Sequence, residues 1–194
     1  ANGNQWALVF FDSINVKALG ALGDGASDDT KPLKSAISFS SGRSFSVLLP
    51  AGTYNIDTSQ GSIELPESTE MRGVGGNHVR RQSVASQGTI INILGVAASP
   101  FKYSRGCYIH GLNIDYPDQD EDPTVPSIYP ETFTPVDTGA FCFFENLIFD
   151  RTYFGFKTGG GSTFNNVHGS FYRTMIRIED SLALSHGNKT ILML

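Results

Sequence analysis

The segment INVKALGALGDGASDDTKPLKSAI, residues 14–37, decides the fold of this chain. Its first five residues alternate between apolar and polar side chains, which predicts a short strand over residues 14–18. Gly20, Gly23 and Gly25 follow and predict a tight loop, because glycine adopts backbone angles that a Cβ atom forbids. The segment therefore begins as a strand that runs into a glycine loop.

A helix should follow this loop. Residues 28–30 (Asp-Asp-Thr) have side chains that bond the free N–H groups at a helix start, and the aspartate charges suit its positive end. Leu33, Ala36 and Ile37 recur at helical spacing and predict one buried face. Pro32 stands in the first turn, where proline is tolerated. The order is thus strand, glycine loop and capped helix.

Two motifs in this region resemble those of a known superfamily. Residues 16–30, VKALGALGDGASDDT, resemble the opening motif VKDFGAKGDGxxDDT of the pectate-lyase-like superfamily, with Ala18-Leu19 in place of Asp-Phe. Residues 48–54, LLPAGTY, are similar to its hxLPxGxY segment and lie at the expected distance. The resemblance implies an all-β fold, a single-stranded right-handed parallel β-helix with a short N-terminal capping α-helix. It also implies a structural role for the motif's aspartates, in capping and loop bonding.

The resemblance suggests how the chain is divided. Residues 1–13 form a leading segment or connector, and residues 14–194 form the β-helix, with a capping region over 14–45 and coils over 46–194. A new apolar strand begins near residue 190 without a capping signal. Because an open repeat array needs a cap, we expect the β-helix to be truncated at its C-terminal end.

The composition excludes several function classes. The chain has 194 residues, a net charge of −5 and no basic run, which argues against nucleic acids and anionic membrane surfaces as partners. No apolar run approaches about 18 residues, so neither membrane insertion nor a signal peptide is expected. Two cysteines are too few for a disulfide framework or a zinc site. We expect no metal and no cofactor.

The second half of the chain contains an internal repeat. The sequence CYIHGLNID at residues 107–115 aligns with CFFENLIFD at 142–150, a step of 35 (142 − 107). Within the latter, FENLIF at 144–149 aligns with FNNVHG at 164–169, a step of 20 (164 − 144). A β-helix coil takes about 20 to 25 residues, so 20 is one bare coil and 35 is one coil with an insertion. The insertion, 116–139, is rich in proline and acids and should project as a long loop.

The alignment predicts which side chains face inward. Two inward columns are expected: Leu112 with Leu147 and Val167, and Ile114 with Phe149 and Gly169. A third column, Gly111 with Asn146 and Asn166, should lie at a bend, because asparagine tolerates left-handed geometry and stacked amides bond one another. Cys107 over Cys142 is interpreted as two small apolar residues stacked in the core.

The same alignment places acidic side chains outward on neighbouring coils. Asp115 aligns with Asp150, and adjacent coils lie about 4.8 Å apart, close to the ~5–5.5 Å carboxyl spacing of retaining glycosidases. Glu145 aligns with His110. We therefore take Asp115, Asp150 and Glu145 as candidate catalytic residues. The alternative is that these acids are solvated surface groups and that Asp150 pairs with the adjacent Arg151.

The candidate substrate-binding residues are Tyr116, Tyr129, His110 and His168. The two tyrosines lie in or beside the inserted loop. They either wall a groove in which sugar rings stack or pin the loop to the coil. His168 is alternatively a surface or bend histidine without a ligand.

The superfamily resemblance is most marked with phage tailspikes and capsule depolymerases. It implies binding of a bacterial surface polysaccharide and cleavage of its glycosidic bonds, by a glycoside hydrolase rather than a lyase. It further implies a homotrimer on the virion that acts extracellularly and joins the phage particle through an upstream domain outside this sequence. The alternatives are a non-catalytic structural or glycan-binding spike, and a secreted polysaccharide hydrolase or lyase of the same fold.

Overall fold

A computed structural model gives the architecture of the chain. It describes residues 12–59, 61–75, 88–95, 99–119, 130–137, 139–158 and 161–178, with the backbone alone at 170–175 and 177–178. Nearly all of the predicted leading segment, the polar residues 120–129 and the apolar residues near 190 lie outside this part.

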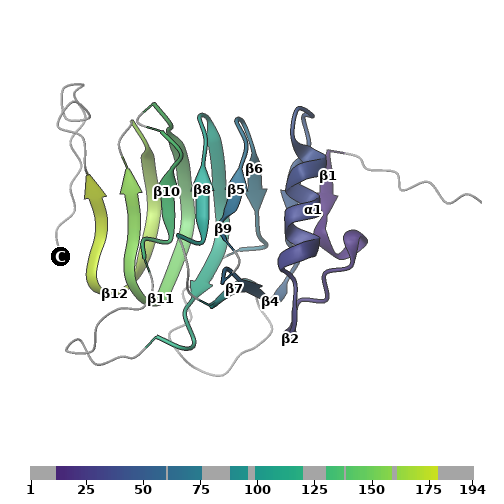
Figure 1. Cartoon of the computed structure of the whole chain (residues 1–194), viewed down its shortest axis with the longest axis horizontal. Coiled ribbons are helices and arrows are strands. Elements are labelled where there is room, and N and C mark those ends of the chain that lie inside the picture. Colours follow the sequence, from purple (N-terminus) through teal and green to yellow (C-terminus); the bar gives the residue numbers. More distant parts are fainter. Residues whose placement is uncertain are drawn as a thin grey trace, which may run out of the picture.

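The described chain is built almost wholly from parallel strands (Figure 1). The strands are β1 (Ser13–Asn15), β2 (Asp24–Asp28), β3 (Ser46–Leu48), β4 (Gly52–Asp57), β5 (Ile63–Leu65), β6 (Glu70–Arg72), β7 (Thr89–Leu94), β8 (Phe101–Tyr103), β9 (Cys107–Asp115), β10 (Phe133–Pro135), β11 (Cys142–Thr158) and β12 (Thr163–Ile178). The helices are the short 3₁₀ helix η1 (Val16–Leu19) and α1 (Thr30–Ser40). Within the described residues no helix is long and apolar enough to cross a membrane.

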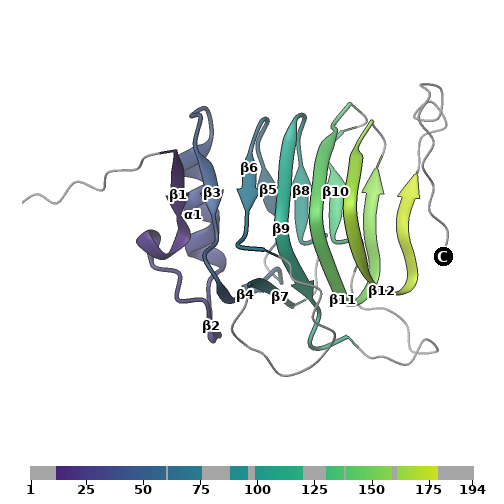
Figure 2. The same cartoon turned by 180° about the vertical axis from the view of Figure 1, so that it is seen from behind.

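The strands stack into three rows that enclose one core, so the fold is a parallel β-helix (Figure 2). The first row contains β1, β3, β6, the start of β9 and the start of β11. The second contains β2, β4, β7, the end of β9 and the middle parts of β11 and β12. The third contains β5, β8, β10 and the end of β11. We call the outward sides of these rows the first, second and third faces.

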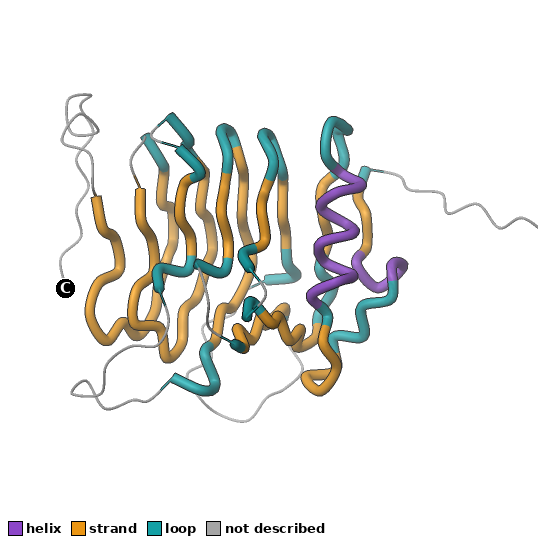
Figure 3. The backbone as a smooth tube through the Cα atoms, viewed as in Figure 1, coloured by secondary structure: helices purple, strands orange, loops and turns teal. Residues whose placement is uncertain are grey.

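The N-terminal end carries α1, as the sequence predicted (Figure 3). Leu33, Ala36 and Ile37 are buried in the core cluster. The backbone N–H of Thr30 donates to Asp28 Oδ1 at 2.9 Å. Asp29, which is 1% exposed, accepts hydrogen bonds from the backbone N–H groups of residues 22 and 23. The two aspartates therefore have capping and loop-bonding roles.

Two details of this region differ from the sequence prediction. The strand ends at Asn15, whose side chain accepts a hydrogen bond from the Lys17 N–H at 2.9 Å and so starts η1 in place of a strand over 14–18. The predicted glycine loop is also shorter, because Asp24–Asp28 forms β2. This strand pairs with β4, which provides partners for its backbone.

The internal repeat is confirmed residue by residue. Cys142 pairs with Cys107 and Asp150 with Asp115, so β11 stacks on β9 with the predicted step of 35. β12 pairs with β11 at the predicted step of 20, with Phe144 opposite Phe164. The inward columns are buried at both β9 and β11, and the half-buried Val167 packs against the core in β12.

The bend column is also confirmed. Gly111, Asn146 and Asn166 all have left-handed backbone angles, with φ of 68°, 52° and 51°. The Asn166 Nδ2 group donates to Asn146 Oδ1 at 2.6 Å, so the amides form a ladder along the bend. The bend separates the first face from the second.

Substituting Asn146 should show that backbone geometry selects this residue. Asn146→Ala is expected to lower the free energy of unfolding by about 1–2 kcal/mol, because a Cβ without a polar group is disfavoured in left-handed geometry and the amide ladder is broken. Asn146→Gly loses the same hydrogen bond but fits the backbone, and should lose less. Urea denaturation of the two variants measures the difference; an equal loss would contradict the backbone argument.

The predicted C-terminal boundary of the inserted loop is wrong. Residues 116–139 were expected to project, but Phe133–Pro135 forms β10, in register with β8 and β11. The reason is the Phe133 ring, which is fully buried and stacks between Phe101 and Phe156. Pro135 is tolerated because β10 pairs with β11 only at Phe133, so at Pro135 the strand has a ladder partner on one side only.

Candidate functional site

The candidate catalytic residues divide between two faces of the β-helix. Glu145 lies in register with His110 before the bend, on the first face. Asp115 and Asp150 lie in register with each other after the bend, on the second face. All four side chains are partly exposed and alternate with buried neighbours, so they point outward as predicted. The three predicted catalytic carboxyls therefore do not form a single site.

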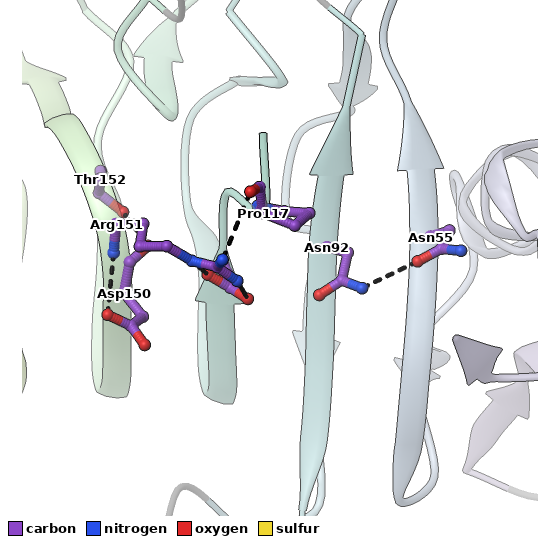
Figure 4. Close-up of polar contacts among 7 residues, drawn as sticks. Asn55, Asn92, Pro117, Asp150, Arg151 and Thr152 are labelled. Carbon is purple, nitrogen blue, oxygen red and sulfur yellow. Dashed lines mark hydrogen bonds and ion pairs between the residues drawn. The ribbon is translucent and has the colours of Figure 1, made fainter. Parts of the chain in front are cut away.

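On the second face, an arginine holds the aspartate pair. The guanidinium of Arg151 binds Asp115 with two hydrogen bonds, one from Nε to Oδ1 at 2.8 Å and a second to Oδ2. The backbone N–H of Arg151 donates to Asp150 Oδ1 at 3.0 Å (Figure 4). Arg151 thus bonds Asp150 through its backbone N–H, whereas its guanidinium pairs with Asp115 on the preceding coil; the backbone at Arg151 is left-handed, with φ 51°.

This arrangement ties neighbouring coils together. Nη1 of Arg151 also lies 3.4 Å from the carbonyl oxygen of Pro117, at the start of the inserted segment. The row of polar side chains continues along this face, where Asn92 Nδ2 donates to Asn55 Oδ1 at 2.9 Å (Figure 4). Both oxygens of Asp115 are engaged, so the guanidinium must leave before Asp115 can act on a glycosidic oxygen. Catalysis by Asp115 and Asp150 stays a prediction.

The first face carries a denser group of side chains, which we call the Glu145 cluster: Glu70, Tyr108, His110, Glu145 and Asn165. Its members come from β6, β9, β11 and β12, on four successive coils. The Tyr108 hydroxyl donates to Glu145 Oε2, and Asn165 Nδ2 donates to Oε1 at 2.8 Å. The Nε2 atom of His110 lies 3.0 Å from Glu70 Oε1.

The hydrogen bonds of this cluster run diagonally across the coils. Tyr108 is in register with Glu70 but bonds Glu145, whereas His110 is in register with Glu145 but bonds Glu70. The two rings lie side by side, stacked with centroids 4.3 Å apart and planes 18° apart. The cluster therefore holds two carboxyls on either side of a stacked phenol and imidazole.

The phenol of Tyr108 is a stable proton donor. Its hydrogen bond to Glu145 is the main cause that raises the pKa of Tyr108 to about 12, with contributions from burial and from the charges of Glu145 and Glu70. A donor that keeps its proton throughout the physiological range fixes the Glu145 carboxylate as an acceptor. It also supplies a neutral acid beside His110.

Ultraviolet titration should detect this shift. The difference between wild type and Tyr108→Phe is expected to show one phenol that ionises near pH 12, not near 10; subtraction removes Tyr54, whose pKa burial also raises to about 12. Because the folded-state pKa is raised, the stabilisation is complete below pH 10 and is lost as the pH rises through about 12. The free energy of unfolding should therefore fall less steeply over this window in Tyr108→Phe. An ionisation near pH 10 would contradict the hydrogen bond.

The predicted substrate-binding residues have different outcomes. The prediction that Tyr116 contacts the substrate is wrong, because this side chain is 1% exposed and its hydroxyl forms a 2.6 Å hydrogen bond with Thr132 Oγ1. It pins the inserted segment to the coil, the alternative left open above. Tyr129 lies outside the described residues. His168 is exposed on the second face, with Nε2 2.6 Å from Asn166 Oδ1. His110 belongs to the Glu145 cluster.

The cysteines and acids offer no further reactive centre in the described part of the chain. Cys107 and Cys142 are free, stacked and buried, and burial raises the pKa of both thiols, as expected for core residues. No group of three or more His, Cys, Asp or Glu side chains that could hold a metal ion occurs among the described residues.

Sequence reasoning missed several members of these sites. Tyr108 could have been found, because it stands two residues before His110 and so shares its face of the strand. Glu70 could not, because the long segment between β6 and β9 hides their register. The ion pair between Arg151 and Asp115 could not have been found either, because it depends on a second left-handed residue that the sequence repeat does not mark.

The comparisons with known proteins agree with this fold. Residues 13–100 match the family model described as "Rhamnogalacturonase A/epimerase, pectate lyase-like". The match spans 88 residues (100 − 13 + 1) of the 194 and contains both motifs on which the resemblance rests. The match covers the N-terminal part of the chain, and the stacked parallel coils confirm the β-helix fold that the resemblance implies. No curated protein sequence matches the chain.

The chain is similar to solved structures from one bacterium and one phage. The mannuronan C-5 epimerase AlgE4 A-module of Azotobacter vinelandii is 18% identical, with a TM-score of 0.55 over 79% of this chain and 50% of that one. The AlgE6 A-module of the same organism is 21% identical, with a TM-score of 0.49 over 81% and 50%. ORF18 of Geobacillus virus E2 is 20% identical, with a TM-score of 0.45 over 75% and 25%. The chain thus spans half of each epimerase module and a quarter of the phage protein.

Proposed function

We propose that this chain is part of a phage tailspike-like protein that binds a bacterial surface polysaccharide and cleaves its glycosidic bonds at the Glu145 cluster. The observation that carries the proposal is the arrangement of Glu70 and Glu145 on either side of the stacked Tyr108 and His110 rings, on an outward face of the β-helix. The likeness of the opening motif to that of tailspikes supports the same class.

The spacing of the two carboxyls suggests the stereochemistry. Glu70 and Glu145 belong to strands two ladder steps apart and are offset by two residues along the strand, so their backbones lie roughly 11–12 Å apart. This separation is far from the ~5–5.5 Å of retaining glycosidases and nearer to the ~6.5–9.5 Å of inverting ones. Glu145 accepts hydrogen bonds on both oxygens and is assigned as the base that activates water. Glu70, bonded to His110, is assigned as the acid that protonates the leaving oxygen.

The test is depolymerisation of a panel of capsular polysaccharides and O-antigens. We expect new reducing ends on at least one glycan, with the first anomer seen by NMR inverted relative to the substrate. Retention of configuration would move the chemistry to Asp115 and Asp150, whose coils are one step apart. No cleavage of any glycan by the folded chain would favour the non-catalytic structural or glycan-binding spike.

A second candidate is a polysaccharide lyase, favoured by the Tyr108 phenol. Its pKa of about 12 keeps it protonated, and it lies against His110, so an acid and a base stand side by side. In β-elimination from an acidic sugar, the base removes the proton beside the carboxyl group and the acid protonates the leaving oxygen. Products would then absorb in the ultraviolet through their new double bond and incorporate no oxygen from labelled water.

The proposal also includes the location and the oligomeric state of the protein. By its likeness to tailspikes, we place the chain on the virion as a homotrimer that acts outside the host cell and joins the particle through an upstream domain. The alternative is a secreted enzyme with the same fold. Light scattering of the purified chain distinguishes a trimer from a monomer.

A further inference from the structure

An exposed phenylalanine lies beside the Glu145 cluster. Phe143 is 45% exposed and stands two residues before Glu145, on the same face of β11. Along the β-helix it is in register with Tyr108 on one side and Thr163 on the other. The Phe141 ring meets it edge-on, with centroids 6.0 Å apart and planes 90° apart.

The exposure of this ring contrasts with its surroundings. Other phenylalanines of β11, such as Phe144 and Phe149, are buried and contribute hydrophobic stabilisation that Phe143 largely forgoes. The remaining exposed large apolar side chains of the described chain lie outside the strands, at Leu22, Phe39, Val74 and Val136. Phe143 is thus a flat apolar surface in the middle of a sheet, next to a group of polar side chains.

We infer that Phe143, held by Phe141, is a platform on which a sugar ring stacks, next to the bond that is cut at Glu145. This inference rests on the proposed function and specifies its binding residue. Two residues along a strand span about 6.6 Å, a distance comparable with one sugar unit, so a ring on Phe143 places a neighbouring unit at Glu145. The ligand class is a pyranose whose axial C–H bonds form an apolar face, as in β-glucose- or β-galactose-type units.

The test compares three variants with the glycan that the wild-type chain binds. Phe143→Ala is expected to weaken binding about tenfold, measured by calorimetry, with KM raised far more than kcat is lowered. Phe143→Trp keeps a flat aromatic ring and should bind within about threefold of wild type. Its added indole should change fluorescence on saturation beyond any change in wild type, whose one tryptophan is Trp6. Phe39→Ala, at a phenylalanine of similar exposure on α1, is the control and should bind normally.

The outcomes separate this inference from the proposed function. If wild type binds and cleaves a glycan but Phe143→Ala binds it equally well, the platform is wrong and the proposed function stands. If the wild-type chain binds no glycan, both are wrong. If Phe143→Ala instead changes the molecular mass by light scattering, the ring belongs to a subunit interface and the platform is again wrong. The fluorescence of Phe143→Trp decides the question even if the alanine variant folds poorly.

Discussion

Replacing Glu145 with glutamine is expected to slow polysaccharide depolymerisation by about 10²- to 10⁴-fold, the usual loss when a general base is removed. The glutamine side chain has the same shape and can still bond one of the two donors, Tyr108 or Asn165, that now hold the carboxylate. The folded structure should therefore persist while the ability to take a proton from water is lost. Release of reducing ends under saturating glycan measures the rate, and circular dichroism checks the fold.

A second carboxyl provides the matched control. Glu64 is exposed on the third face, in register with Lys102, and belongs to none of the clusters described above. Glu64→Gln removes the same charge and should leave the rate unchanged, which separates a loss of catalysis from a general effect of charge. Full activity in Glu145→Gln, combined with loss in Asp115→Asn and Asp150→Asn, would place catalysis on the second face.

The repeat made much of the fold predictable. A step of 20 or 35 residues fixes the register of a whole strand, because a slip by one residue would turn every buried side chain outward. For this reason the bend at Asn146, the inward column of Leu147 and the outward positions of Glu145 and Asp150 all followed from the alignment of β9, β11 and β12. The capping helix was predictable from a separate signal, the motif at residues 16–30.

The sites could be predicted only in part, because the alignment gives positions and not the directions of long side chains. His110 and Glu145 were expected to meet, since they are in register, but each reaches diagonally to a residue of another coil. Arg151 likewise crosses to Asp115, although Asp150 is its neighbour in the chain. Such choices depend on local backbone angles and on competing partners, which a one-dimensional pattern does not contain.

Replacing Phe133 with alanine is expected to lower the free energy of unfolding by about 3–5 kcal/mol. This ring is fully buried and stacks on Phe101 at 5.1 Å and on Phe156 at 5.5 Å, and it also contacts Phe144 at 5.2 Å. Alanine would leave a cavity between three coils, since the neighbouring rings are fixed by their own strands and cannot close it. Denaturation in urea, followed by circular dichroism, measures the loss.

The same experiment decides how the inserted segment behaves. Thr134 is the outward neighbour of Phe133 in β10, so Thr134→Ala should change stability by no more than about 0.5 kcal/mol. A loss below about 1 kcal/mol in Phe133→Ala would mean that residues 133–135 do not pack as a strand and that the segment projects, as its prolines and acids alone predicted. A large loss would mean that one aromatic ring outweighs this composition, because burying it in the ladder stabilises the coil more than the flanking residues oppose it.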